Sequence, residues 1–210
     1  MTTTRPHRGT TRAQRADARR NVAAILEAAT ACLTRNSGAS MGEIAQAAGV
    51  GRVTLYGHFK TRAELVEAVL TRTLERADAV LEATDTRGDP RDALTRLVAA
   101  SWQIVDQHRS VLHAAEQELP AGRIRGKHDR ILRRIQSLID RGQRDGIFRA
   151  DLPKRWLVTT AFSLMHSAAD DVTAGRLDPA RAADTIAATL LAAYTPPGAQ
   201  VPERSTDRTT

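Results

Sequence analysis

Residues 40–60 hold the side chains whose types and spacing are best suited to a chemical task, and that task is the recognition of a polyanion. Two short helical segments, 41–48 and 52–58, meet at Gly49, where the next turn needs a left-handed backbone residue. Arg52 opens the second segment, and a guanidinium placed there can pair with guanine O6 and N7. The same segment and its end also present Val53, Thr54, Tyr56, His58 and Lys60. This pattern predicts a helix-turn-helix whose second helix lies in the DNA major groove.

The distribution of charge also favours a polyanionic partner. The chain of 210 residues has a formal net charge of +7. Residues 1–62 carry ten basic and three acidic side chains, whereas residues 63–210 carry 21 of each sign, so the whole excess lies in the first third. A localised basic region is the electrostatic footprint of a nucleic-acid partner, although a solvated basic tail has the same composition.

Helices are the elements that must position these groups. Apolar periodicity, capping residues and Gly or Pro punctuation predict nine of them and no strand. Ser40 with Glu43 forms a capping box, and the helix N–H groups that follow it can meet a phosphate. The expected helices span residues 17–35, 41–48, 52–58, 61–83, 90–105, 110–119, 121–145, 153–174 and 179–194.

The expected fold is all-α, with an N-terminal three-helix helix-turn-helix domain followed by a C-terminal helical bundle. We expect a disordered basic arm at 1–16, the DNA-binding domain at 17–62, a ligand-binding and dimerisation domain at 63–195, and a disordered tail at 196–210. The arm either adds minor-groove or phosphate contacts or serves as a solubilising tail.

Several side chains of the later helices are candidates for a small-molecule site. They are Trp102, His113, Glu116, Phe162, Met165 and His166. His113 and Glu116 share a helix face at a spacing that can ligate a metal, but polar pocket or surface groups are the favoured interpretation. His166 either lines a cavity or is a core histidine with a hydrogen-bond partner. Trp102 is first a core residue and second a pocket wall.

Catalysis is not indicated, because the chain has no Gly-rich phosphate loop, no paired carboxylates in an acid–base context and no nucleophile with a plausible base. We expect no catalytic residue, metal or cofactor. Cys32 is the one cysteine; we interpret it as a packing residue rather than a redox sensor, and it favours a reducing compartment. With no transmembrane run and no signal-peptide core, we expect a soluble, cytoplasmic protein without a membrane partner.

The segment 21–69 resembles the DNA-binding domain of the TetR/AcrR repressor family. The coinciding features are Ile25-Leu26, Ala28-Ala29, Ile44-Ala45, Ala48-Gly49-Val50, Thr54-Leu55-Tyr56, His58-Phe59-Lys60, Arg62, Glu64 and Leu65. The resemblance implies a nine-helix homodimer whose first three helices bind DNA and whose last two pair with those of a partner. It implies DNA contacts at Arg52, Val53, Thr54, Tyr56, His58 and Lys60, with Met41 and Gly42 where the second helix meets the DNA backbone.

The function expected from these observations is a ligand-responsive transcriptional repressor. It would bind a palindromic double-stranded DNA operator as a homodimer, and an unknown, partly apolar small-molecule effector would release it. A nucleoid-associated or adaptor protein that binds DNA without an effector is the alternative. The two are distinguished by a closed, partly apolar cavity among the middle helices. A helical enzyme would need a convergent set of titratable groups around His113 and Glu116.

Overall fold

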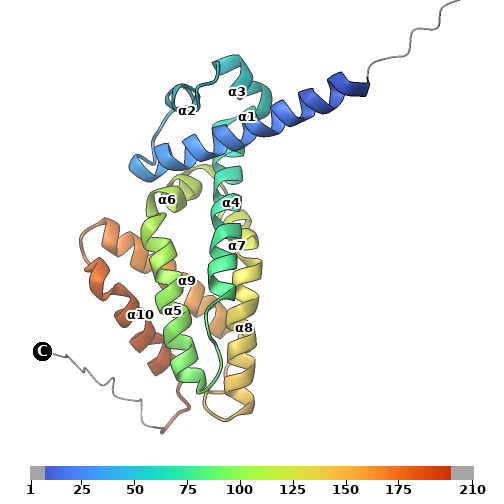
Figure 1. The fold of residues 1–210 in the computed structure, drawn as a ribbon. Helices are drawn as coiled ribbons and strands as arrows, with labels where there is room; N and C mark the ends of the chain where they lie inside the picture. The colour runs from blue at the N-terminus through green and yellow to red at the C-terminus, as the bar shows by residue number, and fades with distance from the viewer. Residues whose placement is uncertain (1–7, 200–210) are drawn as a thin grey trace, which may run out of the picture. The chain divides into compact units, whose positions relative to one another are not determined.

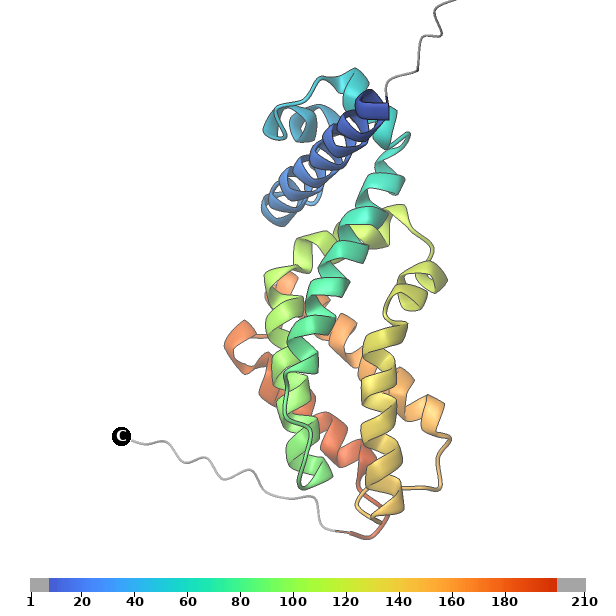
Figure 2. The same cartoon turned by 45° about the vertical axis from the view of Figure 1, so that its right-hand side comes forward.

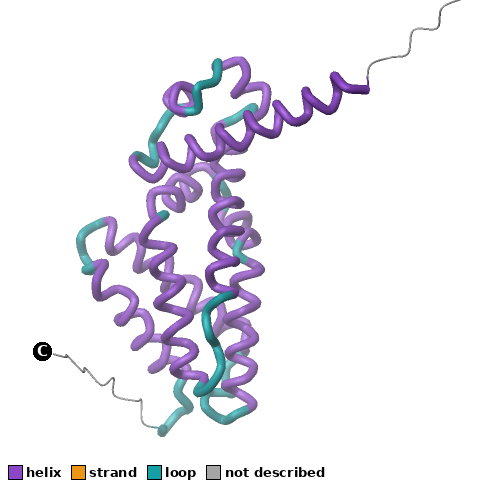
Figure 3. The backbone as a smooth tube through the Cα atoms, in the orientation of Figure 1, coloured by secondary structure: helices purple, strands orange, loops and turns teal. Residues whose placement is uncertain are grey.

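Helix is the regular structure throughout residues 8–199, the part of the chain that the computed structural model describes (Figures 1 and 3). The ten helices in this range are α1 (Arg8–Arg35), α2 (Met41–Ala47), α3 (Arg52–His58), α4 (Arg62–Glu82), α5 (Pro90–Gln107), α6 (Arg109–Glu118), α7 (Ala121–Lys127), α8 (Asp129–Arg144), α9 (Lys154–Thr173) and α10 (Pro179–Tyr194). The expected all-α class is confirmed. Residues 1–7 of the expected arm and 200–210 of the expected tail lie outside the described range.

The chain divides into two compact units, which are described separately. The first, the head unit, comprises the chain up to Thr73 together with Ser110–Ile124. The second, the bundle unit, comprises Leu74–Arg109 and the chain from Arg125 onward. We expected the DNA-binding domain to end at residue 62, but the first half of α4 and nearly all of α6 belong to the same unit as α1, α2 and α3.

Local signals in the sequence start and end the short α2 of the head unit. The N–H of Glu43 donates to Ser40 Oγ at 3.2 Å, and the N–H of Ser40 donates to Glu43 Oε2 at 2.7 Å. Hydrogen bonds to its carboxylate, first from the Ser40 backbone N–H and then from the Ser40 side chain, lower the pKa of Glu43 below its ordinary value. Gly49 follows α2 with a φ of 66°, a left-handed conformation that glycine adopts without steric cost. Both the capping box and the glycine turn were expected from the sequence, and both are confirmed.

In the bundle unit, α5 packs against α8, α9 and α10, and Figures 1 and 2 show α5 and α10 side by side. Two predicted helix starts are confirmed here: Asp89 caps α5 ahead of Pro90, and Asp178 caps α10 ahead of Pro179. Large side chains that are fully buried in this unit include Leu94, Leu97, Ile139, Leu157, Ile186 and Leu190. The core is therefore aliphatic, as a chain with 3% aromatic residues requires.

Tyr194 fixes the end of α10 against α9. Its side chain is fully buried, and its hydroxyl donates to the Leu157 carbonyl at 2.6 Å. Its ring meets that of Phe148 edge to face, with the centroids 5.7 Å apart. Burial raises the pKa of the phenol above its ordinary value, so the group stays a neutral hydrogen-bond donor.

The first helix is longer than expected from the sequence. α1 begins at Arg8, whereas we expected a disordered arm up to residue 16 and a helix from residue 17. The added segment contains no proline, and alanine, arginine and glutamine outnumber its single glycine and its two threonines. These are residues of high intrinsic helix propensity, which allows the helix to extend toward the N-terminus without a capping signal.

The segment 121–145 was expected to form one helix and instead forms α7 and α8. His128 separates them: its N–H donates to the Arg125 carbonyl three residues back, at 3.0 Å, in place of the four-residue spacing of an α-helix. Gly122 and Gly126 lie within α7, where each weakens the helix by about 1 kcal/mol relative to alanine. The break at His128 follows from this weak first segment.

Candidate functional site

The turn between α2 and α3 is held by backbone hydrogen bonds. The N–H of Gly49 donates to the Gln46 carbonyl, and that of Val50 to the Ala45 carbonyl, each at 3.1 Å. Ala45 is buried, and its small side chain lets the two helices approach closely. The fully buried Ile44 and Leu55 lie on either side of the turn. The direction of α3 against α2 is thereby fixed.

One face of α3 is turned to solvent. Val53 is 88% exposed and Tyr56 is 46% exposed, so two of the four large hydrophobic side chains found exposed in the described range lie on this seven-residue helix. Arg52 and Thr54 are also exposed, whereas Leu55 on the opposite face is fully buried. The guanidinium of Arg52 can pair with the edge of guanine in the major groove, and the methyl groups of the neighbouring Val53 can contact the methyl group of thymine.

The guanidinium of Arg52 lies against Gly42 of α2. A methyl group added at Gly42 would come 2.9 Å from Arg52 Nη2 and 3.3 Å from its Cζ. The missing side chain at Gly42 therefore leaves the space that the Arg52 side chain occupies. Sequence reasoning placed both residues at the DNA interface but did not anticipate that they touch.

The remaining candidate DNA contacts differ in their exposure to solvent. Lys60 and Ser40 are exposed, and His58 is partly exposed at the end of α3. Met41 is 8% exposed and its side chain belongs to the core of the head unit, so a DNA contact at this position would come from its main chain. Since Met41 is the first residue of α2, its backbone N–H, rather than its side chain, is the group positioned to meet a phosphate.

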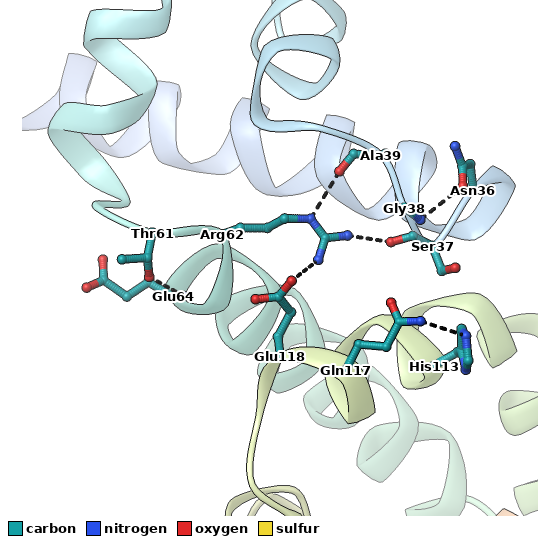
Figure 4. A network of polar contacts seen from close by, with 10 residues as sticks. All are labelled: Asn36, Ser37, Gly38, Ala39, Thr61, Arg62, Glu64, His113, Gln117 and Glu118. Carbon is teal, nitrogen blue, oxygen red and sulfur yellow. Dashed lines mark hydrogen bonds and ion pairs between the residues drawn. The ribbon is translucent and has the colours of Figure 1, made fainter.

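Arg62 at the start of α4 connects three parts of the head unit (Figure 4). Its Nε donates to the Ala39 carbonyl at 3.2 Å, and its Nη2 donates to the Ser37 carbonyl in the loop between α1 and α2. Its Nη1 forms an ion pair with Glu118 of α6. The two side chains are 21% and 28% exposed, so the pair is partly shielded from solvent. Arg62 thus holds the loop that leads into α2.

Two further ion pairs hold α4 within the head unit. Arg72 Nη2 lies 2.6 Å from Glu27 Oε2 on α1, and Arg72 Nη1 donates to the Ala23 carbonyl at 3.3 Å. Arg123 Nη1 lies 3.5 Å from Glu67 Oε2. These ion pairs hold together the helices that support the helix-turn-helix. They therefore preorganise the exposed face of α3.

A cavity lies within the bundle unit, among α4, α5, α8, α9 and α10. Its empty volume, which includes the space of its open mouth, is about 690 Å³. Most of its wall is aliphatic and includes Leu74, Leu81, Leu97, Ile131 and Ile135. Three residues predicted from the sequence for a ligand site, Phe162, Met165 and His166, all line it.

An aromatic cluster forms part of the cavity wall. The rings of Phe162 and His166 have their centroids 4.2 Å apart, and the ring of His128 lies 5.2 Å from the first and 5.4 Å from the second. Arg125 lies over the Phe162 ring, 5.1 Å from its centroid, and its Nη2 donates to Thr159 Oγ1 at 3.0 Å. His128 was not predicted as a site residue, because the sequence placed it inside a continuous helix.

The other three predicted ligand-site residues do not line the cavity. Trp102 is buried, and its Nε1 donates to the Pro179 carbonyl at 3.2 Å, which makes it a core residue of the bundle unit. His113 and Glu116 are exposed on α6 in the head unit, where His113 Nε2 lies 3.0 Å from Gln117 Nε2. In the described range, no group of three or more His, Cys, Asp or Glu residues is placed to hold a metal ion.

The arrangement of α2, the Gly49 turn and α3 defines the helix-turn-helix class of DNA-binding proteins. Residues 25–69 match the family model of the bacterial regulatory proteins of the tetR family. The chain therefore carries a DNA-binding segment of the tetR-family type within its head unit. No helix in the described range is both long and apolar enough to cross a membrane.

Known proteins resemble the chain over different lengths. The HTH-type transcriptional repressor LfrR of Mycolicibacterium smegmatis is 37% identical over 78 residues, which are 37% of this chain and 41% of the relative. The structure of LfrR from Mycobacterium smegmatis in complex with proflavine has a TM-score of 0.62 and 24% identity, covering 82% of this chain and 94% of that one. The fatty acid degradation regulator FadR of Bacillus halodurans has a TM-score of 0.69 and 20% identity, covering 81% and 94%. The structural matches establish a shared fold.

Proposed function

We propose that this chain is a dimeric transcriptional repressor that binds a palindromic operator and is released by a small molecule. The observation that carries the proposal is the exposed face of α3, with Arg52, Val53 and Tyr56 open to solvent on a helix whose direction is fixed by the Gly49 turn. The excess positive charge of residues 1–62 supports it, because it draws the head toward phosphates. A regulator of this kind acts in the cytoplasm, where a bacterial chromosome lies.

Dimerisation through α9 and α10 is the assembly that we infer. Trp156 on α9 is 58% exposed, a large apolar surface left in water. Small side chains are exposed along α10: Ala180, Thr185, Ala188, Thr189 and Ala192. Such a surface lets two helices approach closely, as in a helix bundle. A two-fold dimer reads two half-sites separated by one turn of DNA, about 34–36 Å, or a multiple of it.

Control by a small molecule is favoured over an adaptor or nucleoid-associated role by the cavity of the bundle unit. An adaptor has no need of a cavity with an apolar wall and two imidazoles. That the relative LfrR has been crystallised with proflavine supports a ligand at this fold. A ligand releases DNA by as much as its affinity differs between the two conformations of the protein.

The experiment that tests operator recognition is selection of duplexes from a random-sequence library by the full chain. We expect an enriched palindrome, and Arg52→Ala should weaken its binding by about 1–3 kcal/mol and relax one base position in each half-site. Arg133→Ala, which removes the same charge from the exposed surface of α8, is the matched control. A library without enrichment, or equal losses for both variants on every sequence, would overturn the proposal.

A further inference from the structure

The cavity of the bundle unit has an uneven distribution of polar groups. His128 and His166 are two of its few polar lining residues, and both belong to the aromatic cluster with Phe162. The wall contributed by α4 and α8 is otherwise aliphatic, with Leu74 and Ile135 among its members. A ligand that fills this space therefore meets hydrocarbon over most of its surface and imidazole rings at one place.

The placement of acidic side chains around the cavity also bears on its ligand. Among the described residues that line it, none is an aspartate or a glutamate. Asp78 follows the lining residue Ala77 on α4, but its carboxylate is committed to α8: Oδ1 lies 3.0 Å from Arg134 Nε and Oδ2 lies 3.4 Å from Arg130 Nη1. Arg125 is not among the lining residues, but it lies over the Phe162 ring of the aromatic cluster, 5.1 Å from the ring centroid.

We propose that the effector is an amphipathic acid, with an apolar body in the aliphatic part of the cavity and a carboxylate at His128 and His166. This inference rests on the proposed function, because it names the ligand of the same regulator. Each imidazole can donate an N–H to a carboxylate, and a hydrogen bond that an ionised carboxylate accepts is charge-assisted. Arg125 adds a permanent positive charge over the Phe162 ring of the same aromatic cluster.

A cationic ligand of the same shape is disfavoured by the same groups. An ammonium group buried in this cavity would lose its hydration and would find no carboxylate in the lining to replace it. A neutral ligand would gain only the burial of its apolar body. The head group should therefore decide the order of affinity: acid first, then alcohol, then amine.

The test uses two series of probes that share a body and differ in head group. They are decanoic acid, decanol and decylamine, and 4-butylbenzoic acid, 4-butylbenzyl alcohol and 4-butylbenzylamine. Binding to the full chain is measured by titration calorimetry at pH 7 without DNA. We expect the tightest of the six ligands to be an acid, at least tenfold tighter than its own alcohol and amine. Any other order, or no binding by either acid, overturns the proposal.

Variants of the two histidines assign the effect to the named groups. The double substitution His128→Phe and His166→Phe keeps aromatic rings in the wall and removes the N–H donors. We expect it to weaken the acid at least tenfold and to change the affinity of the matched alcohol less than twofold. Ser163→Ala, on the exposed face of α9, should leave both affinities unchanged. Equal losses of acid and alcohol would show that the histidines act only through packing and would overturn the assignment.

Failure of this inference is separable from failure of the proposed function, because operator binding is measured without any probe. If the selected operator is bound and no acid binds the protein, the acid is rejected and DNA recognition stands. If no operator is bound, the proposed function falls whatever the calorimetry gives.

Discussion

The ion pair between Arg62 and Glu118 offers the sharpest test of how the head unit is held together. Removing Glu118 leaves Arg62 with its two bonds to the Ala39 and Ser37 carbonyls. Removing Arg62 breaks all three contacts and leaves the loop before α2 without its anchor. The two substitutions, Glu118→Ala and Arg62→Ala, should therefore differ in size although they disrupt the same ion pair.

The magnitudes follow from the number of bonds and their exposure. A hydrogen bond to a charged group contributes about 1.5–3 kcal/mol when it is shielded, and fully exposed pairs contribute about 0.2–1 kcal/mol. With the two side chains 21% and 28% exposed, we expect Glu118→Ala to cost about 1 kcal/mol of unfolding free energy. Arg62→Ala also frees two backbone carbonyls and should cost about 2–4 kcal/mol. The double variant should cost about the same as Arg62→Ala alone, which gives a coupling energy of about 1 kcal/mol.

The assay is urea unfolding followed by circular dichroism on the two single variants and the double variant. Glu75→Ala on α4 is the control, because Glu75 is an exposed helical glutamate of the bundle unit. A coupling energy indistinguishable from zero, or a Glu118→Ala cost no larger than that of Glu75→Ala, would refute the role assigned to the pair. Operator affinity should fall in the order of the stability losses, since the loop leads directly into α2.

Two further predictions concern single contacts. Gly42→Ala should displace the Arg52 guanidinium, because the new methyl group would approach it to 2.9 Å. We expect the preferred base in each half-site to change, while the free energy of unfolding changes by less than about 1 kcal/mol. A repeated selection that gives an unchanged operator would contradict this prediction. Burial opposes ionisation of Asp78, but hydrogen bonds and charge from Arg134 and Arg130 outweigh it and lower its pKa. The ionised Asp78 therefore adds to the free energy of unfolding at pH values above its unfolded-state pKa of about 3.9. This stabilisation is lost as the pH falls through the lower pKa of the folded state. Asp78→Asn should cost about 1–3 kcal/mol at pH 7 and progressively less below pH 4 in urea titrations, and a cost that does not vary with pH would exclude the ionic contribution.

The sequence was sufficient where the physical cause is local. Ser40 with Glu43, and Asp89 and Asp178 ahead of their prolines, satisfy backbone N–H groups within three residues, so the helices start where these residues stand. The position of α3 was predictable for the same reason, because a glycine turn and one buried face define it. Phe162, Met165 and His166 of α9 were predicted for a ligand site and do line the cavity.

The sequence was insufficient where the cause is a contact between distant segments. Arg62 and Glu118 are 56 residues apart, and nothing in the local pattern of either one identifies its partner. Met41 has the spacing of a DNA contact, but its side chain enters the core of the head unit. His128 was not predicted for the cavity because its ring contacts with Phe162 and His166 join segments that are distant in the sequence. His113 and Glu116 were misplaced because residues on one helix face can point into solvent as readily as into a cavity.

The composition of the head unit sets a condition on how it forms during synthesis. Its parts are not contiguous: the chain up to Thr73 is completed by Ser110–Ile124, which carries Glu118 and the fully buried Val111, Ala114 and Ala115. At a translation rate of roughly 5–20 residues per second, Arg62 leaves the ribosome about 3 to 11 seconds before its partner, 56 residues later. A fragment cut after α4 would have its recognition helix but would lack α6. The head unit of the nascent chain is therefore incomplete until the first segment of the bundle unit, Leu74–Arg109, has been synthesised.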